Sequence, residues 1–231
     1  MNKSAFLTVK KKRKKTMKAM VISGGSIDRA FTKEWIQNFA PDYIVAADRG
    51  LLFCMEEKLK VDMIVGDFDS LPGGVIDGYL STFDVPVRTF NPVKDYTDTE
   101  IALRQAMEAG ADEILLFGVT GTRLDHCIGN MQCLHICLDA GIRAAILDPH
   151  NRITLHEKDF SIEKSSQFGG FVSFIPAGDA IRGLTLTGFK YPLNDRDITP
   201  TDSLCISNQI TEETASVSFR EGRLFMIESR D

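Results

Sequence analysis

Two aspartates, separated by a single residue, stand at the end of an apolar run of strand length. The segment reads "MIVGDFDS" from Met63 to Ser70, and its acids are Asp67 and Asp69. In an extended chain, residues two apart point to the same side, so these two carboxylates would repel each other. A divalent cation removes that repulsion, and Mg²⁺ prefers oxygen ligands such as carboxylates and substrate phosphates. The pair therefore predicts a Mg²⁺ site.

A third acid follows at a predicted helix start. Thr97 and Glu100 have the spacing of a capping box just before an apolar helical pattern, which puts Asp98 in the first turn. An acid in that position also complements the helix dipole without any ligand. Spacing alone therefore leaves Asp98 open to a structural or a metal-binding role.

A second helix start, "GTRLDH" from Gly121 to His126, has the residues of a phosphate site. A glycine-bearing turn follows a strand-like run, and Arg123 and Asp125 come directly after it. Helix N-termini bind anions, and an arginine guanidinium can donate two hydrogen bonds to one phosphate. The P-loop, GxGxxG and G-x-S-x-G patterns do not occur in the sequence, which argues against those nucleotide sites and against a serine nucleophile of that type.

The elements that would position these residues alternate along the first two thirds of the chain. Near-continuous apolar runs predict strands at 19–23, 43–48, 62–67, 85–90, 113–118 and 144–148, and helical patterns lie between them at 28–39, 50–59, 73–82, 98–109 and 123–139. This alternation predicts a three-layer α/β domain with a parallel sheet over residues 17–150. Ligands bind outside the carboxyl ends of such strands, where Asp48 and Asp67 stand.

The pattern of apolar and polar residues changes after Pro149. Short runs that alternate apolar with polar residues are separated by Gly, Pro, Asn and Asp, and no long helical pattern remains. This pattern predicts an all-β sandwich or barrel over residues 151–231.

Composition limits the classes of function. The chain has 231 residues, 43% apolar and 26% charged, as in ordinary globular proteins, and no run is long enough for a membrane span. Residues 1–16 carry seven positive charges and no acid, which predicts a disordered tail; the remainder then carries −5 − 7 = −12. An acidic body argues against nucleic acid as the main partner. An odd number of cysteines, five, without a secretory signal pattern favours reduced thiols in the cytoplasm.

Taken together, the motifs resemble one family. "ADRG" (47–50), "GDFDS" (66–70), "DYTDTE" (95–100), "GTRLDH" (121–126) and Ser207-Asn208 occur in the order and approximate spacing of thiamine pyrophosphokinases, over essentially all of residues 17–231. The resemblance implies an α/β ATP-binding domain followed by a thiamine-binding β-sandwich, in a homodimer with active sites at the interface. It implies a Mg²⁺-dependent transfer of the pyrophosphoryl group of ATP to the hydroxyl of thiamine, giving thiamine diphosphate and AMP.

The resemblance also implies roles for matching positions. Asp67, Asp69 and Asp98 would be the metal-binding and catalytic acids. Substrate contacts would come from Asp48, Thr97, Arg123, Asp125, Tyr191, Ser207 and Asn208. Tyr191 stands where some members have a tryptophan, and Arg49 replaces a glycine of the commoner "ADGG".

Two other functions remain open from the sequence. One is a Mg²⁺-dependent phosphohydrolase of the haloacid dehalogenase kind, with Asp67 of the D-x-D as its nucleophile. The other is a non-catalytic thiamine or nucleotide sensor. The spacing also leaves open which acid accepts the proton of the thiamine hydroxyl.

Overall fold

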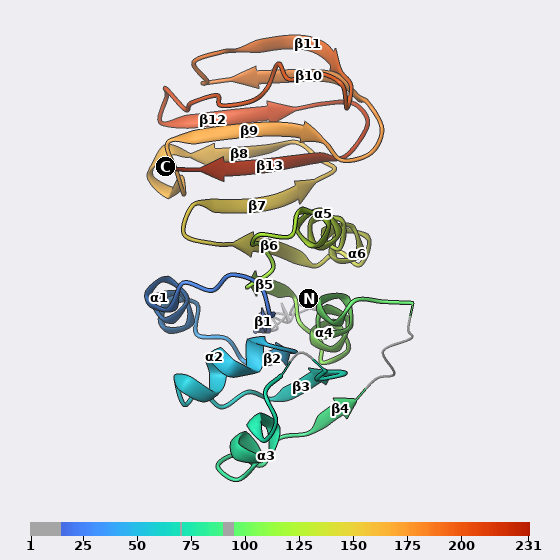
Figure 1. Ribbon diagram of the computed structural model, residues 1–231. Helices are drawn as coiled ribbons and strands as arrows, with labels where there is room; N and C mark the ends of the chain where they lie inside the picture. The colour runs from blue at the N-terminus through green and yellow to red at the C-terminus, as the bar shows by residue number, and fades with distance from the viewer. Residues whose placement is uncertain (1–14, 70, 90–94) are drawn as a thin grey trace, which may run out of the picture.

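The computed structural model describes residues 15–69, 71–89 and 95–231, so most of the predicted basic tail lies outside the described residues. Helices and strands alternate up to residue 147, apart from two consecutive helices before the last strand there, and beyond it the elements are strands and one short 3₁₀ helix (Figure 1). In chain order the elements are β1 (Lys18–Ile22), α1 (Arg29–Phe39), β2 (Tyr43–Ala47), α2 (Gly50–Glu56), β3 (Met63–Gly66), α3 (Val75–Leu80), β4 (Val87–Thr89), α4 (Asp98–Glu108), β5 (Glu113–Phe117), α5 (Leu124–Gln132), α6 (Leu134–Asp139), β6 (Arg143–Leu147), β7 (Asn151–His156), β8 (Phe160–Glu163), the 3₁₀ helix η1 (Lys164–Ser166), β9 (Phe171–Pro176), β10 (Ile181–Thr187), β11 (Leu193–Ile198), β12 (Thr214–Ser218) and β13 (Leu224–Ser229).

One continuous sheet runs through most of the molecule. Its nine strands have the order β4-β3-β2-β1-β5-β6-β7-β13-β9. The pairs from β4 to β6 are parallel, as the sequence predicted, and the pairs from β6 to β9 are antiparallel. The boundary predicted at residue 150 falls in the turn between β6 and β7, which pair with each other. The sheet therefore changes strand direction there without a break (Figure 1).

A second sheet completes the predicted β-sandwich. Its four antiparallel strands have the order β11-β10-β12-β8. Phe174 of β9 and Leu224 of β13 share one apolar core with Leu184 and Leu186 of β10. The antiparallel end of the large sheet is thus one layer of the sandwich, and the small sheet is the other.

Helices cover both faces of the parallel strands. One face packs Ala102 of α4 and Cys137 of α6 against Leu116 and Ile146 of the sheet. The opposite face packs Phe39 of α1, Phe53 of α2 and Tyr79 of α3. In Figure 1, α1, α2 and α3 lie to one side of the sheet and α4, α5 and α6 to the other. Strands buried on both faces explain why their sequences are almost continuously apolar.

The helix predicted over 123–139 is two helices. α5 and α6 are separated at Cys133, and the amide of Ile136 donates to the carbonyl oxygen of Cys133 at 3.1 Å, an i to i+3 bond that tightens the turn. Gly129 lies one turn earlier, where a glycine weakens a helix. None of the helices in the described part of the chain has the length and the apolar stretch that crossing a membrane requires.

Candidate active site

Three carboxylates form a cluster at the carboxyl edge of the parallel strands. Asp48, Asp67 and Asp98 are half-buried, and one oxygen from each lies within 4.8 Å of the other two. Asp48 follows β2, Asp67 follows the neighbouring β3, and Asp98 is the first residue of α4. Adjacent parallel strands end at the same edge, and α4 packs across β1, β2 and β3. The fold therefore brings together three acids that are 50 residues apart at the extremes; we call them the acid cluster.

Local backbone features hold the acid cluster in place. Asp48 has a left-handed backbone with φ of 47°, and a Cβ added to Gly66 would collide with its Oδ1 atom. Thr97 caps α4, because its hydroxyl accepts a hydrogen bond from the Glu100 amide at 3.2 Å, as the sequence predicted. Thr99, in the first turn of α4, shares a buried 2.7 Å hydrogen bond with Ser23 at the end of β1. These contacts fix the start of α4 against the strand ends.

The electrostatics of the acid cluster favour a cation. The pKa of Asp48 is raised to about 7, first by burial, then by the charge of Asp98 and a hydrogen bond with it, and then by the charge of Asp67. The backbone N–H of Phe68, which donates to the Asp48 carboxylate, acts in the opposite direction. Oδ1 of Asp48 is buried and has no hydrogen-bond partner among the described residues. A buried carboxylate oxygen without a partner beside two further acids suits a bound cation.

Asp69 lies differently from its neighbour Asp67. Among the residues that the structure describes, the acid cluster includes Asp67 but not Asp69, which is exposed. The condition on which the two side chains would point the same way is an extended chain, and it is not met, because Phe68 between them has φ of 63°. The backbone N–H of Asp69 turns back to donate to Oδ1 of Asp67 at 3.3 Å. The metal-binding role expected for Asp69 stays a prediction.

Arg123 and Asp125 lie at the N-terminus of α5 and pair with each other. The guanidinium donates from Nη2 to Oδ2 of Asp125 at 2.6 Å and from Nε to Oδ1 at 3.2 Å. This bond lowers the pKa of Asp125 and raises that of Arg123. Both side chains are exposed, so the guanidinium is accessible to a phosphate that competes with the carboxylate.

The predicted residues of the β-sandwich form a separate group. Asn208 is buried, and its side-chain amide holds Tyr191 from both sides: Oδ1 accepts from the Tyr191 amide at 3.0 Å, and Nδ2 donates to the Tyr191 carbonyl at 2.8 Å. The ring of Tyr191 is exposed, with the ammonium of Lys190 5.5 Å from its centroid. Ser207 is exposed and has φ of 58°. Tyr191 and Ser207 are thus accessible to a ligand, whereas Asn208 positions Tyr191.

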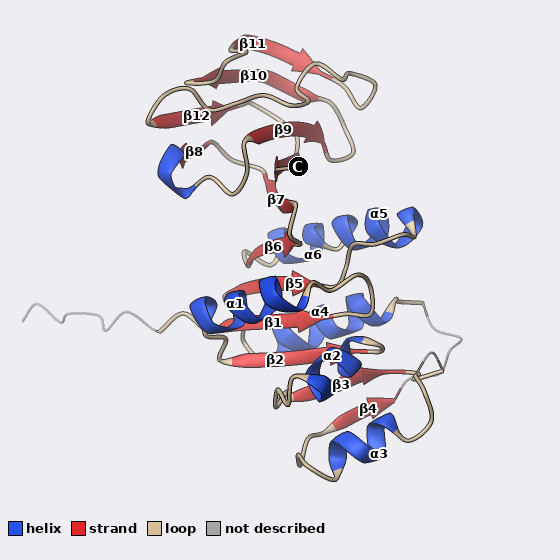
Figure 2. Cartoon of the chain, turned by 60° about the vertical axis from the view of Figure 1, so that its left-hand side comes forward, coloured by secondary structure: helices blue, strands red, loops and turns tan. Residues whose placement is uncertain are grey.

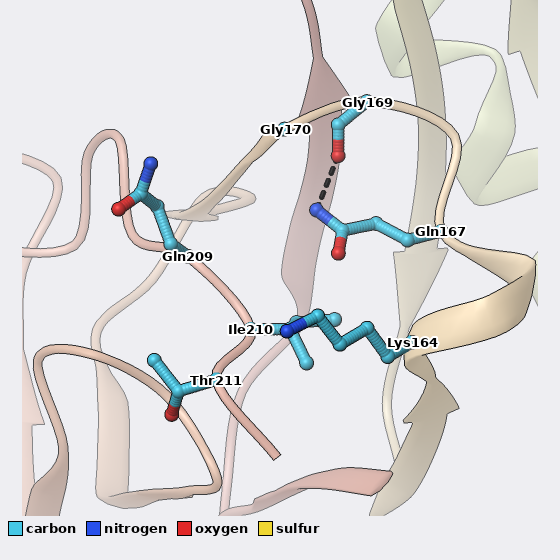
Figure 3. Close-up of a pocket in the computed structure, with 7 residues that line it drawn as sticks. All are labelled: Lys164, Gln167, Gly169, Gly170, Gln209, Ile210 and Thr211. Atoms are coloured by element: carbon cyan, nitrogen blue, oxygen red, sulfur yellow. Dashed lines mark hydrogen bonds between the residues drawn. The ribbon is translucent and has the colours of Figure 1, made fainter. Parts of the chain in front are cut away.

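One cavity borders this second group, and the acid cluster does not line it. It has a volume of about 510 Å³ and lies between the loop after η1 and the segment that follows Asn208 (Figure 3). The lining residues are Lys164, Gln167, Gly169, Gly170, Gln209, Ile210 and Thr211. Figure 3 shows the amide of Gln167 turned toward the carbonyl of Gly169 and the Lys164 side chain reaching over Ile210. The lining has amides, a hydroxyl and one ammonium but no carboxylate, so the cavity does not suit a cation.

The two groups of predicted residues lie far apart in one chain. Asp48 follows β2, whereas Asn208 forms a bridge to Val172 of β9, six strands further along the sheet order. With neighbouring strands about 4.8 Å apart, the separation is roughly 30 Å. In Figure 1, β2 lies in the lower half of the molecule and β9 in the upper half. One small molecule therefore cannot touch both groups within a single chain.

Comparison with known proteins matches both halves of the chain. The family model described as "Thiamin pyrophosphokinase, catalytic domain" matches residues 35–146, and the model described as "Thiamin pyrophosphokinase, vitamin B1 binding domain" matches residues 158–224. The acid cluster, Arg123 and Asp125 fall in the first range, and Tyr191, Ser207 and Asn208 fall in the second.

Individual proteins give the same match. Thiamine pyrophosphokinase of Bacillus subtilis is 35% identical over 188 residues, which is 81% of this chain and 87% of that protein. Its crystal structure superposes with a TM-score of 0.83 at 32% identity, covering 93% of this chain and 99% of that chain. The crystal structure of the thiamin pyrophosphokinase from Geobacillus thermodenitrificans gives a TM-score of 0.80 at 34% identity, covering 93% and 98%.

Proposed function

This chain belongs to the thiamin pyrophosphokinase family, and on that premise we propose that it transfers the pyrophosphoryl group of ATP to the hydroxyl of thiamine. The products are thiamine diphosphate and AMP. The observation that carries the proposal for this chain is the acid cluster, which lies at the ligand-binding edge of the sheet and within the range of the catalytic-domain model.

The acid cluster fits a Mg²⁺ ion. It offers only carboxylate oxygens, which are the ligands Mg²⁺ prefers, and Oδ1 of Asp48 is a buried oxygen without a partner among the described residues. Asp48, Asp67 and Asp98 would hold the ion. When bound there with ATP, Mg²⁺ supplies positive charge that offsets the negative charge of the phosphates.

The residues around the acid cluster then have defined tasks. The hydroxyl oxygen of thiamine attacks the β-phosphorus of ATP, a new P–O bond forms, and the bond to the bridging oxygen of AMP breaks. A carboxylate at the cluster takes the hydroxyl proton. Arg123, freed from Asp125, donates hydrogen bonds to phosphate oxygens, and the N-terminus of α5 adds its positive dipole end. Such transfer depends mainly on positioning and on charge neutralisation.

The roughly 30 Å between the acid cluster and the Tyr191 group favours an active site shared by two copies of the chain. The acid cluster of one copy would meet Tyr191 and Ser207 of the other. Their aromatic ring and hydroxyl are exposed, and an aromatic face attracts a cation such as the thiazolium ring of thiamine. We therefore propose a homodimer with both active sites at the interface.

Two exposed apolar patches support this arrangement. α5 carries Leu124 and Ile128 on its surface, with side chains 72% and 60% exposed, and Asn130 is the one buried residue of this fully described helix. Leu204 and Ile206, 54% and 47% exposed, directly precede Ser207. Figure 2 shows α5 reaching past the ends of β1 and β5. Each patch adjoins one half of the proposed site, so packing α5 against the 204–206 segment of a second copy brings the two halves together.

A product assay tests the proposed function. Purified protein with ATP, Mg²⁺ and thiamine should form AMP and thiamine diphosphate in equal amounts, separated by chromatography, and Asp98→Asn should form neither. ADP as the nucleotide product would contradict the proposal. Thiamine-independent phosphate release with a phosphoenzyme at Asp67 would indicate the phosphohydrolase instead. Tight binding of both substrates without turnover would indicate a sensor.

We propose the cytoplasm as the site of this activity. All five cysteines lie among the described residues, and each is a free thiol. Burial raises the pKa of four of them, Cys54 and Cys137 to about 12 and Cys133 and Cys205 to about 11, which keeps them protonated and unreactive. Free thiols of this kind suit a reducing compartment.

A further inference from the structure

Phe68 has an unusual backbone conformation for a large residue. Its φ of 63° lies in the left-handed region, which bulky side chains rarely adopt. It stands between Asp67, which belongs to the acid cluster, and Asp69, which does not. Backbone strain of this kind persists only where the surrounding structure holds it.

The ring of Phe68 holds the turn. It is half-buried and packs against the apolar core on the α1–α3 face of the sheet. It also lies over Gly66, where an added Cβ would come within 3.1 Å of the ring. The amide of Leu71 donates to the Phe68 carbonyl at 3.2 Å and closes the turn on its other side.

The turn sets the geometry of the acid cluster in two ways. It directs the backbone N–H of Phe68 at the Asp48 carboxylate. It also reverses the chain, so that the Asp69 amide donates back to Oδ1 of Asp67. Asp67 is thereby presented to Asp48 and Asp98, all within 4.8 Å.

We propose that Phe68 is a positioning residue for the acid cluster: its ring anchors the left-handed turn that holds Asp67 and Asp48 at the spacing a divalent cation requires. The proposal rests on the proposed function only in that the cluster binds a metal. A ring that served core packing alone would affect stability and leave metal affinity unchanged.

Metal binding without substrates separates these two roles. Phe68→Gly keeps a residue suited to positive φ but removes the anchor, and its affinity for Mn²⁺, measured by electron paramagnetic resonance of the unbound ion, should fall at least tenfold. Phe68→Tyr keeps the ring and should stay within twofold of wild type. In steady-state assays, Phe68→Gly should require more Mg²⁺ for half-maximal rate, with the KM for thiamine unchanged.

Phe83→Ala is the matched control. Phe83 is an aromatic residue packed against the same apolar core through Tyr79, and it is not part of the turn. Its removal should lower the melting temperature and leave Mn²⁺ affinity unchanged. Gly66→Ala tests the acid cluster itself, because the new Cβ collides with Oδ1 of Asp48; it should weaken Mn²⁺ binding with the Phe68 ring still present.

The outcomes separate the two ideas. Wild-type affinity in Phe68→Gly, or an equal loss in Phe83→Ala, overturns the positioning role and leaves the proposed function intact. If Phe68→Gly does not fold, Phe68→Leu decides, because it keeps an apolar side chain but removes the ring; unchanged Mn²⁺ affinity there overturns the role. A wild-type protein that binds no Mn²⁺ overturns the metal site and the positioning role together, and AMP formation from ATP and thiamine then tests the transfer reaction separately.

Discussion

At the scale of single residues, the acid cluster is a place where stability and function oppose each other. Three carboxylates within 4.8 Å repel one another, and one buried oxygen of Asp48 has no partner among the described residues. Without a metal, this arrangement costs folding free energy. Removing one charge should therefore stabilise the metal-free protein while it removes the proposed metal site.

Asp48→Asn is the direct test of that opposition. In the presence of a chelator, the variant should be more stable than wild type by about 1 kcal/mol, or roughly 2–4 °C in Tm. Its activity with Mg²⁺ should fall by about 100-fold or more. Asp69→Asn is the comparison, because Asp69 lies outside the acid cluster; its Tm in chelator should not rise above that of wild type. A lower Tm for Asp48→Asn would show that repulsion among the three carboxylates does not destabilise the metal-free protein.

The side chain of Asn208 makes a second prediction at this scale. Asn208→Asp keeps the shape but replaces the group that donates to the Tyr191 carbonyl with a second acceptor. A lost buried hydrogen bond costs about 1–3 kcal/mol. If Tyr191 contacts thiamine, the KM for thiamine should rise roughly tenfold, since 1.4 kcal/mol is a factor of ten, with little change in the KM for ATP.

Lys164→Ala serves as the control for Asn208. Lys164 lines the neighbouring cavity, and its side chain is not part of the bonds that hold Tyr191. Its KM for thiamine should equal that of wild type. Equal effects from both substitutions would place thiamine in the cavity instead of against Tyr191.

At the scale of elements, the strands and most helices were predictable because burial on both faces makes the strand sequences apolar. The parallel sheet, the β-sandwich and the cap at Thr97 were all predicted and are present. The acids at the ends of β2 and β3 were found because strand ends meet at one edge.

Other features depend on contacts that a sequence pattern does not contain. The ring of Phe68 packs against the core, and its backbone turns in the left-handed region. The chain is therefore not extended there, and the pairing of Asp69 with Asp67 assumed that it was. The break at Cys133 is equally local. Asp48 was predicted to contact substrate and not to bind metal. Its place beside Asp98 depends on how α4 packs across the strands, which no sequence pattern contains.

A ring contact between β7 and β8, which lie in different sheets, gives a prediction about pH. His156 of β7 is stacked on Phe160 of β8 at 3.9 Å between ring centroids, and burial lowers its pKa from 6.5 to about 4. Below pH 6.5 the unfolded chain takes up a proton that the folded protein excludes. The contribution of the neutral His156 to the free energy of unfolding is thus fully present above pH 6.5 and is lost as the pH falls toward 4. The loss is about 2 kcal/mol at pH 5.

Urea unfolding at pH 7.5 and pH 5.0 measures this effect. His156→Phe removes the titrating group and keeps an aromatic ring in the stack. The loss of free energy of unfolding between the two pH values should be smaller in the variant by about 2 kcal/mol. An equal loss in both proteins would assign the acid sensitivity to other groups.

At the scale of the whole molecule, the proposed dimer predicts a specific pairing between α5 and the 204–206 segment. Ile128→Lys and Ile206→Asp should each give monomers in sedimentation velocity, because both seams of the symmetric dimer then carry an unpaired charge against an apolar side chain. Mixing the two variants should restore dimers. In the mixed pair, one seam joins Lys to Asp and the other joins the two native isoleucines.

Met55→Asp is the control for the dimer experiment. Met55 is 40% exposed on α2, on the opposite face of the sheet from α5, so a charge there should leave the dimer intact. Single variants that stay dimeric, or a mixture that stays monomeric, would show that these two segments do not meet.

The continuous sheet has a consequence for motion. Proteins with a catalytic region and a substrate-binding region commonly close around their ligand by bending at a hinge. Here β6 and β7 join the two regions through the backbone hydrogen bonds of one continuous sheet. A hinge between the two regions would have to break these bonds. In the proposed dimer, substrate entry and product departure would then depend on rotation of one subunit against the other, and the rate of that rotation would set an upper limit on turnover.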